Sequence, residues 1–237
     1  MSHTTPEGDP IGAPVENWTI PPAPTGAVLE GRHCRLERLA PEHASALFEA
    51  HARDTTGRNW TYLTAGPFER EADYAEWVAA ASNRKDEMHY VVSTEHGPVG
   101  TAAYLRIAPQ DGSIEVGWIT FSPLLQRTRA ATEAMYLMMR WAFESGYRRY
   151  EWKCNALNAP SRRAAQRFGF SYEGVFRNAQ VAKGRNRDTA WYACIDSEWP
   201  AIRNAFESWL APDNFDEDGN QRRSLRDWTK SILIAEG

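Results

Sequence analysis

The most regular hydrophobic pattern lies in the middle of the chain, where a strand pattern runs into a helix pattern. Apolar, aromatic and Thr residues with strand propensity fill 115–121, and Ser122-Pro123 ends this segment because proline cannot donate to a sheet. Apolar residues then recur at the spacing of one buried helix face, at Ala131, Ala134, Met135, Met138 and Ala142. We predict a strand, a short loop and a helix with Thr128 as its N-cap.

The rest of the chain alternates between strand and helix patterns of ordinary length. Strands are predicted at 28–39, 89–93, 99–107, 149–154, 172–176 and 189–195. Helices are predicted at 41–53, 69–81, 161–168 and 200–210, and the polar run 183–188 is predicted to be a turn. Antiparallel strands followed by a β–α–β order predict an α/β sandwich, with a mixed, mostly antiparallel central sheet and helices on both faces.

Proline content and polarity mark the limits of the folded domain. Residues 1–27 hold six prolines without a period, which predicts an extended arm pinned by Trp18 and Ile20. Residues 28–210 carry the periodic patterns and form the predicted domain, and residues 211–237 form a polar tail. A hydrophobic content of 42% is sufficient for one core.

Charge and cysteine content narrow the class of protein. The net charge of −4 provides no global field for binding nucleic acid or an anionic membrane, and no run of 18 apolar residues occurs. The start of the chain lacks a signal-peptide pattern, so we expect a soluble cytoplasmic protein. Three widely spaced cysteines predict buried thiols, and the histidines show no metal-ligand spacing, so no metal site is expected.

The loop between the central strand and helix is a candidate anion site. Backbone N–H groups at a helix start lack intrahelical partners, and the helix dipole favours negative charge there. Arg127 and Arg129 flank these amides, so a phosphate would find donors and positive charge together. The alternative is a structural junction with two solvated arginines.

Four segments around this loop resemble one known family. Gln126–Ala131 lies where the GNAT superfamily of acyl-CoA N-acyltransferases carries its pyrophosphate loop, and 131–134 resembles the branch that includes the ribosomal-protein N-terminal acetyltransferases. Downstream, 158–161 and 167–170 resemble the Asn-x-x-Ser and Arg-x-Gly-Phe segments of that branch. The family usually has glycine where this chain has Arg127 and Arg129, so we expect ordinary backbone dihedrals there, with side chains turned outward.

The resemblance, which covers about residues 28–200, implies an acetyl-CoA site. In the family, the strand equivalent to 115–121 diverges from the one equivalent to 149–154, and the pantetheine arm lies between them. The resemblance therefore assigns Ile119 and Phe121 to pantetheine, and Asn158 and Ser161 to the region where pantetheine meets pyrophosphate. It assigns the pyrophosphate to Gln126, Arg127, Thr128, Arg129, Ala130 and Ala131.

Acetyl transfer requires a base for the amine and an acid for the departing thiolate. Glu115 heads the central strand among apolar neighbours, which suits a base, although an exposed or salt-bridged carboxylate is the alternative. The family often uses a Tyr as the acid, and this chain has Ala165 at that position. Ser161 matches the serine that some members of the branch use instead.

The aromatic residues Trp60, Tyr62 and Tyr104 predict an acceptor pocket with π-faces, although loop-to-core packing would explain the first two equally well. We expect direct acetyl transfer from acetyl-CoA to a primary amine, either a small molecule or a protein N-terminus. The alternatives are a non-catalytic CoA-binding or regulatory module and a protein-interaction domain. An exposed final strand or the proline-rich arm would support a homodimer.

Overall fold

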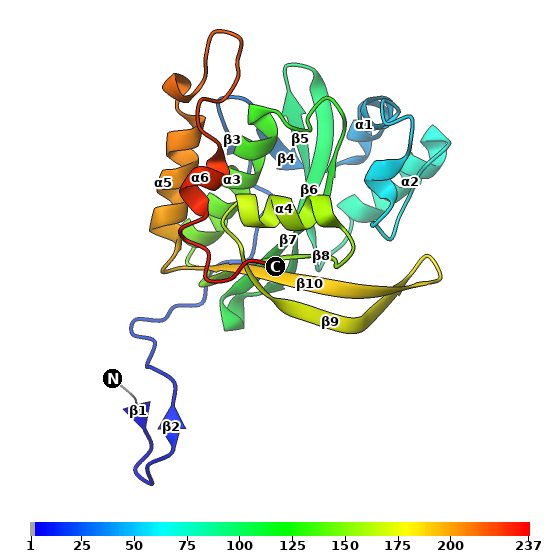
Figure 1. Cartoon of the computed structure of the whole chain (residues 1–237). Helices are drawn as coiled ribbons and strands as arrows, with labels where there is room; N and C mark the ends of the chain where they lie inside the picture. Colours follow the sequence, from blue (N-terminus) through cyan, green and yellow to red (C-terminus); the bar gives the residue numbers. More distant parts are fainter. Residues whose placement is uncertain (1–2) are drawn as a thin grey trace.

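The computed structural model describes residues 3–237 and contains one eight-stranded sheet of order β3–β4–β5–β6–β7–β8–β10–β9 (Figure 1). All neighbouring strands are antiparallel except β7 and β8. This confirms the predicted mixed, mostly antiparallel sheet. The strands are β3 (Leu29–Glu30), β4 (Arg35–Arg38), β5 (Met88–Thr94), β6 (Gly97–Ala108), β7 (Ser113–Phe121), β8 (Arg149–Asn155), β9 (Ser171–Ala182) and β10 (Arg185–Ile195).

Helices cover both faces of the sheet. The α-helices are α1 (Ala44–His51), α2 (Glu71–Ser82), α3 (Arg129–Glu144), α4 (Ala159–Arg167), α5 (Trp199–Leu210) and α6 (Leu225–Thr229). Short 3₁₀ turns occur at Pro41–His43, Arg58–Trp60, Pro109–Asp111 and Pro212–Asn214. Alternation along β5 separates two cores, because Val91 packs with α1 and α2 whereas Tyr90 and Val92 pack on the side of α3, α4 and α5. Among residues 3–237, no helix has the length and apolar character needed to span a membrane.

Two predicted segments, one strand and one turn, differ from the structure. The segment 28–39 is not one strand, because Gly31 and its neighbours turn the chain and separate β3 from β4. The carboxylate of Glu133 on α3 holds this turn by accepting hydrogen bonds from three successive backbone amides. The predicted turn at 183–188 is also wrong, since β9 and β10 continue to a two-residue turn in which Lys183 and Gly184 have φ values of 49° and 71°.

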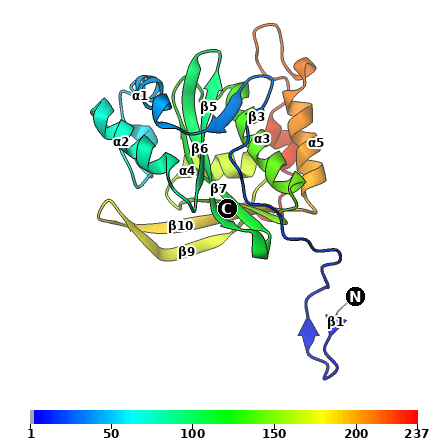
Figure 2. The same ribbon diagram turned by 180° about the vertical axis from the view of Figure 1, so that it is seen from behind.

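The two ends of the chain behave differently. The N-terminal arm forms a small hairpin of β1 (His3–Thr4) and β2 (Pro10–Ile11) that projects from the body (Figures 1 and 2), and its first two residues lie outside the described part. Trp18 packs over Gly112, as predicted for a pinning residue, whereas Ile20 is exposed. Residues 211–237 pack on the domain, and the backbone N–H of Tyr172 donates to the carbonyl of Ala235.

Candidate active site

The parallel pair β7–β8 diverges at the predicted place. Their pairing runs from Ser113–Arg149 to Val116–Trp152, and then stops although both strands continue. Beyond this point β7 contains an irregularity opposite β6, where Trp118 adopts a positive φ of 47°. Ile119 and Phe121 lie on the diverging part of β7 and are partly buried, as the predicted pantetheine contacts would require.

The loop from Ser122 to Ala131 presents amides at the start of α3. Thr128 is the N-cap, as predicted, and its Oγ1 accepts a hydrogen bond from the Ala131 backbone N–H at 3.1 Å. The backbone N–H groups of Arg127, Arg129 and Ala130 have no hydrogen-bond partner among the described residues. Gln126 Nε2 donates to the carbonyl of Phe121 at 2.7 Å, which ties the loop to the end of β7.

The two arginines differ from the expectation of ordinary dihedrals. Arg127 has a φ of 62°, so the expectation is wrong there: the loop retains the left-handed conformation that glycine adopts most easily. Arg129 begins α3 and is helical, and its guanidinium lies 3.6 Å from the ring centroid of Phe215. This stacking comes from the C-terminal segment, which the sequence pattern did not connect with the loop.

The start of α4 brings a hydroxyl beside β8. Asn158 is the N-cap and its Oδ1 accepts from the Ser161 backbone N–H at 3.2 Å. Ser161 Oγ accepts a hydrogen bond from Trp152 Nε1 at 3.0 Å. Burial raises the pKa of the nearby Cys154 thiol, and a hydrogen bond from Ser161 acts in the opposite direction.

Glu115 is buried, as expected, but it is also ion-paired. Arg106 donates to both of its oxygens, at 2.5 and 3.0 Å, and Lys153 Nζ lies 3.0 Å from Oε2. Lys153 also contacts Glu151 at 2.7 Å, and Glu151 accepts from Arg149. The salt-bridged alternative for Glu115 therefore describes this geometry.

Arg106 and Lys153 are site residues that the sequence analysis missed. The alternation within 149–155 places Glu151 and Lys153 on one strand face, which the sequence could have indicated. Their contact with Glu115 depends on the β7–β8 register, in which Glu115 lies opposite Glu151, and this register is not encoded locally.

Two of the three predicted acceptor aromatics belong to the core. Tyr104 is fully buried and its hydroxyl donates to the Met138 carbonyl at 2.7 Å, so the prediction that its ring lines an open pocket is wrong. Trp60 is 4% exposed and packs edge-on against Phe68, which is the loop-to-core alternative. Tyr62 is partly exposed.

The loop that contains Trp60 contacts the β9–β10 tip, because Lys183 Nζ donates to the Trp60 carbonyl at 2.9 Å.

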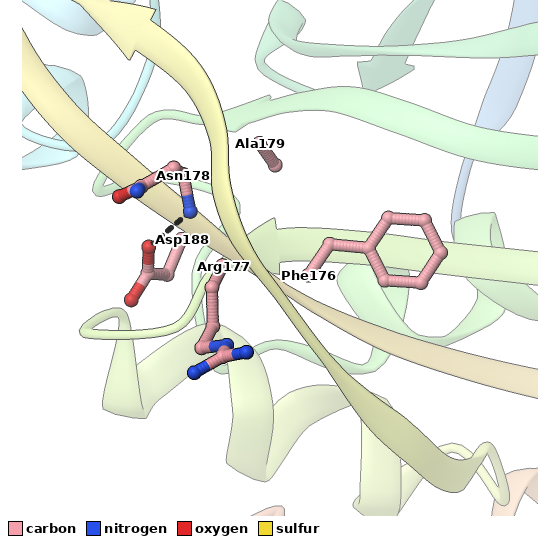
Figure 3. A pocket seen from close by; sticks show the side chains of 5 residues that line it. All are labelled: Phe176, Arg177, Asn178, Ala179 and Asp188. Carbon is pink, nitrogen blue, oxygen red and sulfur yellow. Dashed lines mark hydrogen bonds between the residues drawn. The ribbon is translucent and has the colours of Figure 1, made fainter.

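A separate surface hollow lies on the β9–β10 hairpin and is lined by Phe176, Arg177, Asn178, Ala179 and Asp188 (Figure 3). It coincides with a bulge, because Arg187 and Thr189, two residues apart on β10, pair with Gln180 and Phe176, which are four residues apart on β9. The Asn178 backbone N–H donates to Asp188 across it, and the Phe176 and Arg177 side chains point in different directions. The hollow contains none of the predicted site residues. Residues 3–237 also contain no group of three metal-ligating side chains.

Comparison with known proteins places this geometry in context. Residues 33–171 match the family model described as an acetyltransferase (GNAT) domain. A Bacillus subtilis protein described as an uncharacterized N-acetyltransferase, YnaD, is 32% identical over 140 residues, which cover 58% of this chain and 81% of YnaD. The crystal structure of a GCN5-related N-acetyltransferase from Brucella melitensis is 44% identical, with a TM-score of 0.88, over 91% of this chain and all of that one.

A more distant structure shares the fold alone. RimL, described as a ribosomal L7/L12 alpha-N-protein acetyltransferase, is 19% identical with a TM-score of 0.61, and the match covers 71% of this chain and 94% of that one.

Proposed function

This chain belongs to the GNAT family of acetyl-CoA-dependent N-acetyltransferases, and on that basis we propose that it transfers acetyl directly to a primary amine of a small molecule or a protein N-terminus. The observation that carries the proposal is the divergence of β7 from β8 next to the unpartnered amides at the start of α3. GNAT acetyltransferases use acetyl-CoA as a cosubstrate, and this arrangement offers backbone groups for its extended arm and donors for its phosphates.

The residues of the α3 loop fit a pyrophosphate. The Arg127, Arg129 and Ala130 amides lack partners in the described part of the chain, and the two guanidinium groups add positive charge. Thr128 and Ala131 hold the helix start in place through their cap hydrogen bond, and Gln126 ties the loop to the end of β7. Ile119 and Phe121 would contact pantetheine. Asn158 would contribute by capping α4, which holds the start of that helix and Ser161 in position.

Glu115 has limited capacity to take a proton directly. A carboxylate offers about four lone-pair positions, and the two cations Arg106 and Lys153 occupy three of them. Glu115 would therefore remove the ammonium proton through a water molecule, at its one remaining position.

Ser161 would assist the departure of the coenzyme sulfur. Trp152 Nε1 donates to Ser161 Oγ, so the serine's single hydrogen, which also acts on the Cys154 sulfur, would turn to donate toward the leaving thiolate. In the transfer, the amine nitrogen bonds to the acetyl carbon, the carbon–sulfur bond breaks, and coenzyme A leaves as a thiolate that takes up a proton.

Calorimetric titration with acetyl-CoA and with free CoA tests coenzyme binding. We expect micromolar affinity that weakens at least tenfold in Arg127→Glu or Arg129→Glu and stays unchanged in Arg185→Glu, an exposed residue near the β9–β10 tip. An absence of binding to either ligand would refute the coenzyme site.

Turnover on amine and peptide panels tests the chemistry. Both acceptor classes are included because RimL shares the fold alone and its acceptor does not transfer to this chain. We expect Glu115→Gln to lower kcat and alter its pH profile. Coenzyme binding without turnover on any acceptor would instead identify a non-catalytic CoA-binding module.

A further inference from the structure

One face of β10 carries side chains whose polar atoms have no partner. Arg187 Nε, Thr189 Oγ1 and Trp191 Nε1 are all buried without a hydrogen bond in the structure. They occupy alternate positions, so they share one face of the strand, whereas Ala190 and Tyr192 face the main core. Buried polar atoms are normally satisfied, so a row of three indicates a surface that a ligand or water completes.

This face adjoins the charged cluster around Glu115. Trp191 lies opposite Lys153 in the β8–β10 register, and Lys153 Nζ is 3.5 Å from the centroid of its ring. Phe176 covers Trp191 from the hairpin side at 4.5 Å between ring centroids. The row therefore begins beside the proposed base and continues along β10 toward the hairpin tip.

Charge is balanced in this cluster except at Arg187. Lys153 pairs with Glu115 and Glu151, Arg106 pairs with Glu115, and Arg149 pairs with Glu151 and Glu173. Arg187 makes only a neutral hydrogen bond, from Nη1 to Gln180 Oε1 at 2.7 Å, and has no carboxylate within ion-pair distance in the described part of the chain.

The partial burial of Arg187 makes its lack of a counter-ion energetically important. Desolvation lowers the pKa of Arg187, while Cys154 and, to a smaller extent, Glu115 act in the opposite direction. A half-buried guanidinium without a counter-ion is unfavourable unless a ligand supplies one.

The position of Arg187 suits contact with an acceptor. Two residues further along β10, Thr189 pairs with Asn155 at the end of β8, on the strand that diverges from β7. Four residues before Arg187, Lys183 contacts the Trp60 carbonyl of the α1–α2 connection. Arg187 thus lies between the hairpin tip and the place where the acetyl group would be presented.

We propose that Arg187 binds a carboxylate carried by the acceptor, so that the preferred substrates are amines with an anionic group in the same molecule. The guanidinium offers the planar pair of donors that a carboxylate accepts, and Thr189 and Trp191 supply further donors on the same face. The inference rests on the proposed acetyl transfer. A free amino acid and an acidic peptide both provide this chemistry.

Matched acceptor pairs test the inference with the full chain. The free-amine pair is L-phenylalanine and 2-phenylethylamine, and the peptide pair is Gly-Glu-Ala amide and Gly-Gln-Ala amide. We expect wild type to favour the carboxylate member of at least one pair, and the pair that shows the preference identifies the source. In Arg187→Gln the ratio of kcat/KM within that pair should fall at least tenfold through the KM of the carboxylate member, while KM for acetyl-CoA stays constant.

Two further variants separate recognition from structure. Gln180→Ala removes the hydrogen bond between Arg187 and Gln180 without changing the charge, and it should keep the wild-type preference for the carboxylate acceptor. Arg187→Lys should retain part of it, because a cation remains. Independently of any variant, calorimetry of wild type with CoA should show tighter binding of N-acetyl-L-phenylalanine than of N-acetyl-2-phenylethylamine, or the corresponding difference for the acetylated peptides.

The outcomes separate the two hypotheses. Equal acetylation of both members of each pair, unchanged in Arg187→Gln, would overturn the role of Arg187 and leave acetyl transfer intact. Acetyl-CoA binding with no acetylation of these or any other amines tested would refute the proposed function, and the inference with it.

Discussion

Glu133 anchors the start of α3 to the turn between β3 and β4, and its removal should destabilise the protein strongly. The side chain is 6% exposed, and its carboxylate accepts backbone N–H bonds from Arg32, His33 and Cys34 at 2.9, 2.6 and 2.9 Å. In Glu133→Ala all three donors lose their acceptor. Because Arg32 is exposed and His33 half-buried, water can reach their amides, whereas the amide of the buried Cys34 stays unsatisfied.

The expected loss follows from these contacts. Hydrogen bonds to a charged group contribute about 1.5–3 kcal/mol each, and partial rehydration leaves a net cost of roughly 3–5 kcal/mol for Glu133→Ala. For a chain of this size, that lowers Tm by about 6–20 °C. Glu133→Gln keeps the volume and one accepting oxygen, so it should cost about half as much.

Urea unfolding measures this loss as a shift of the midpoint with an unchanged m-value. The control is Glu144→Ala at the other end of α3, where an exposed carboxylate pairs with Arg203 and contributes about 0–1 kcal/mol. If Glu133→Ala shifted the midpoint no more than Glu144→Ala does, the carboxylate would not hold the turn and our account of the divided first strand would be wrong.

Three further predictions test other parts of the structure. Burial lowers the pKa of His51 from 6.5 to about 4, so the unfolded chain binds the proton more tightly, and the free energy of unfolding falls by up to about 3 kcal/mol as the pH drops from 6.5 to 4. His51→Leu should flatten this pH dependence in unfolding curves recorded across that range, and an unchanged slope would contradict the assignment. Tyr104→Phe should cost about 1 kcal/mol in urea unfolding by removing the buried hydrogen bond from the tyrosine hydroxyl to the Met138 carbonyl, and a raised acceptor KM would contradict its place in the core. Arg127→Gly should be about 1 kcal/mol more stable than Arg127→Ala in thermal unfolding, because φ is 62° there, and equal stability would refute strain at this residue.

The elements around the proposed coenzyme site were predictable because their signals are local. A stripe of apolar residues specifies α3, Thr128 caps it within three residues, and Ser122-Pro123 ends β7. The same local character explains the successful prediction of strands at 89–93 and 99–107, which are adjacent in the chain and pair as β5 and β6.

The unpredicted features depend on residues that are distant in the chain. Lys153 reaches Glu115 only through the parallel register of β7 and β8. A tyrosine suits a buried core as well as a binding pocket, so the residue type of Tyr104 did not predict that it would be buried. The outer half of the β9–β10 hairpin is exposed on both faces, which removes the alternation that would have identified it as strand.

The contact between Lys183 and the Trp60 carbonyl joins residues that are 123 positions apart in the chain. This separation affects the order in which parts of the protein can fold during synthesis. At about 5–20 residues per second, Lys183 is added roughly 6–25 s after Trp60. During that interval the aromatic cluster of α1 and α2 can fold on β4 and β5, while the Trp60 carbonyl remains without its lysine. The contact between the β9–β10 hairpin and the α1–α2 connection is therefore completed late in synthesis, after the strands that precede the hairpin have been made.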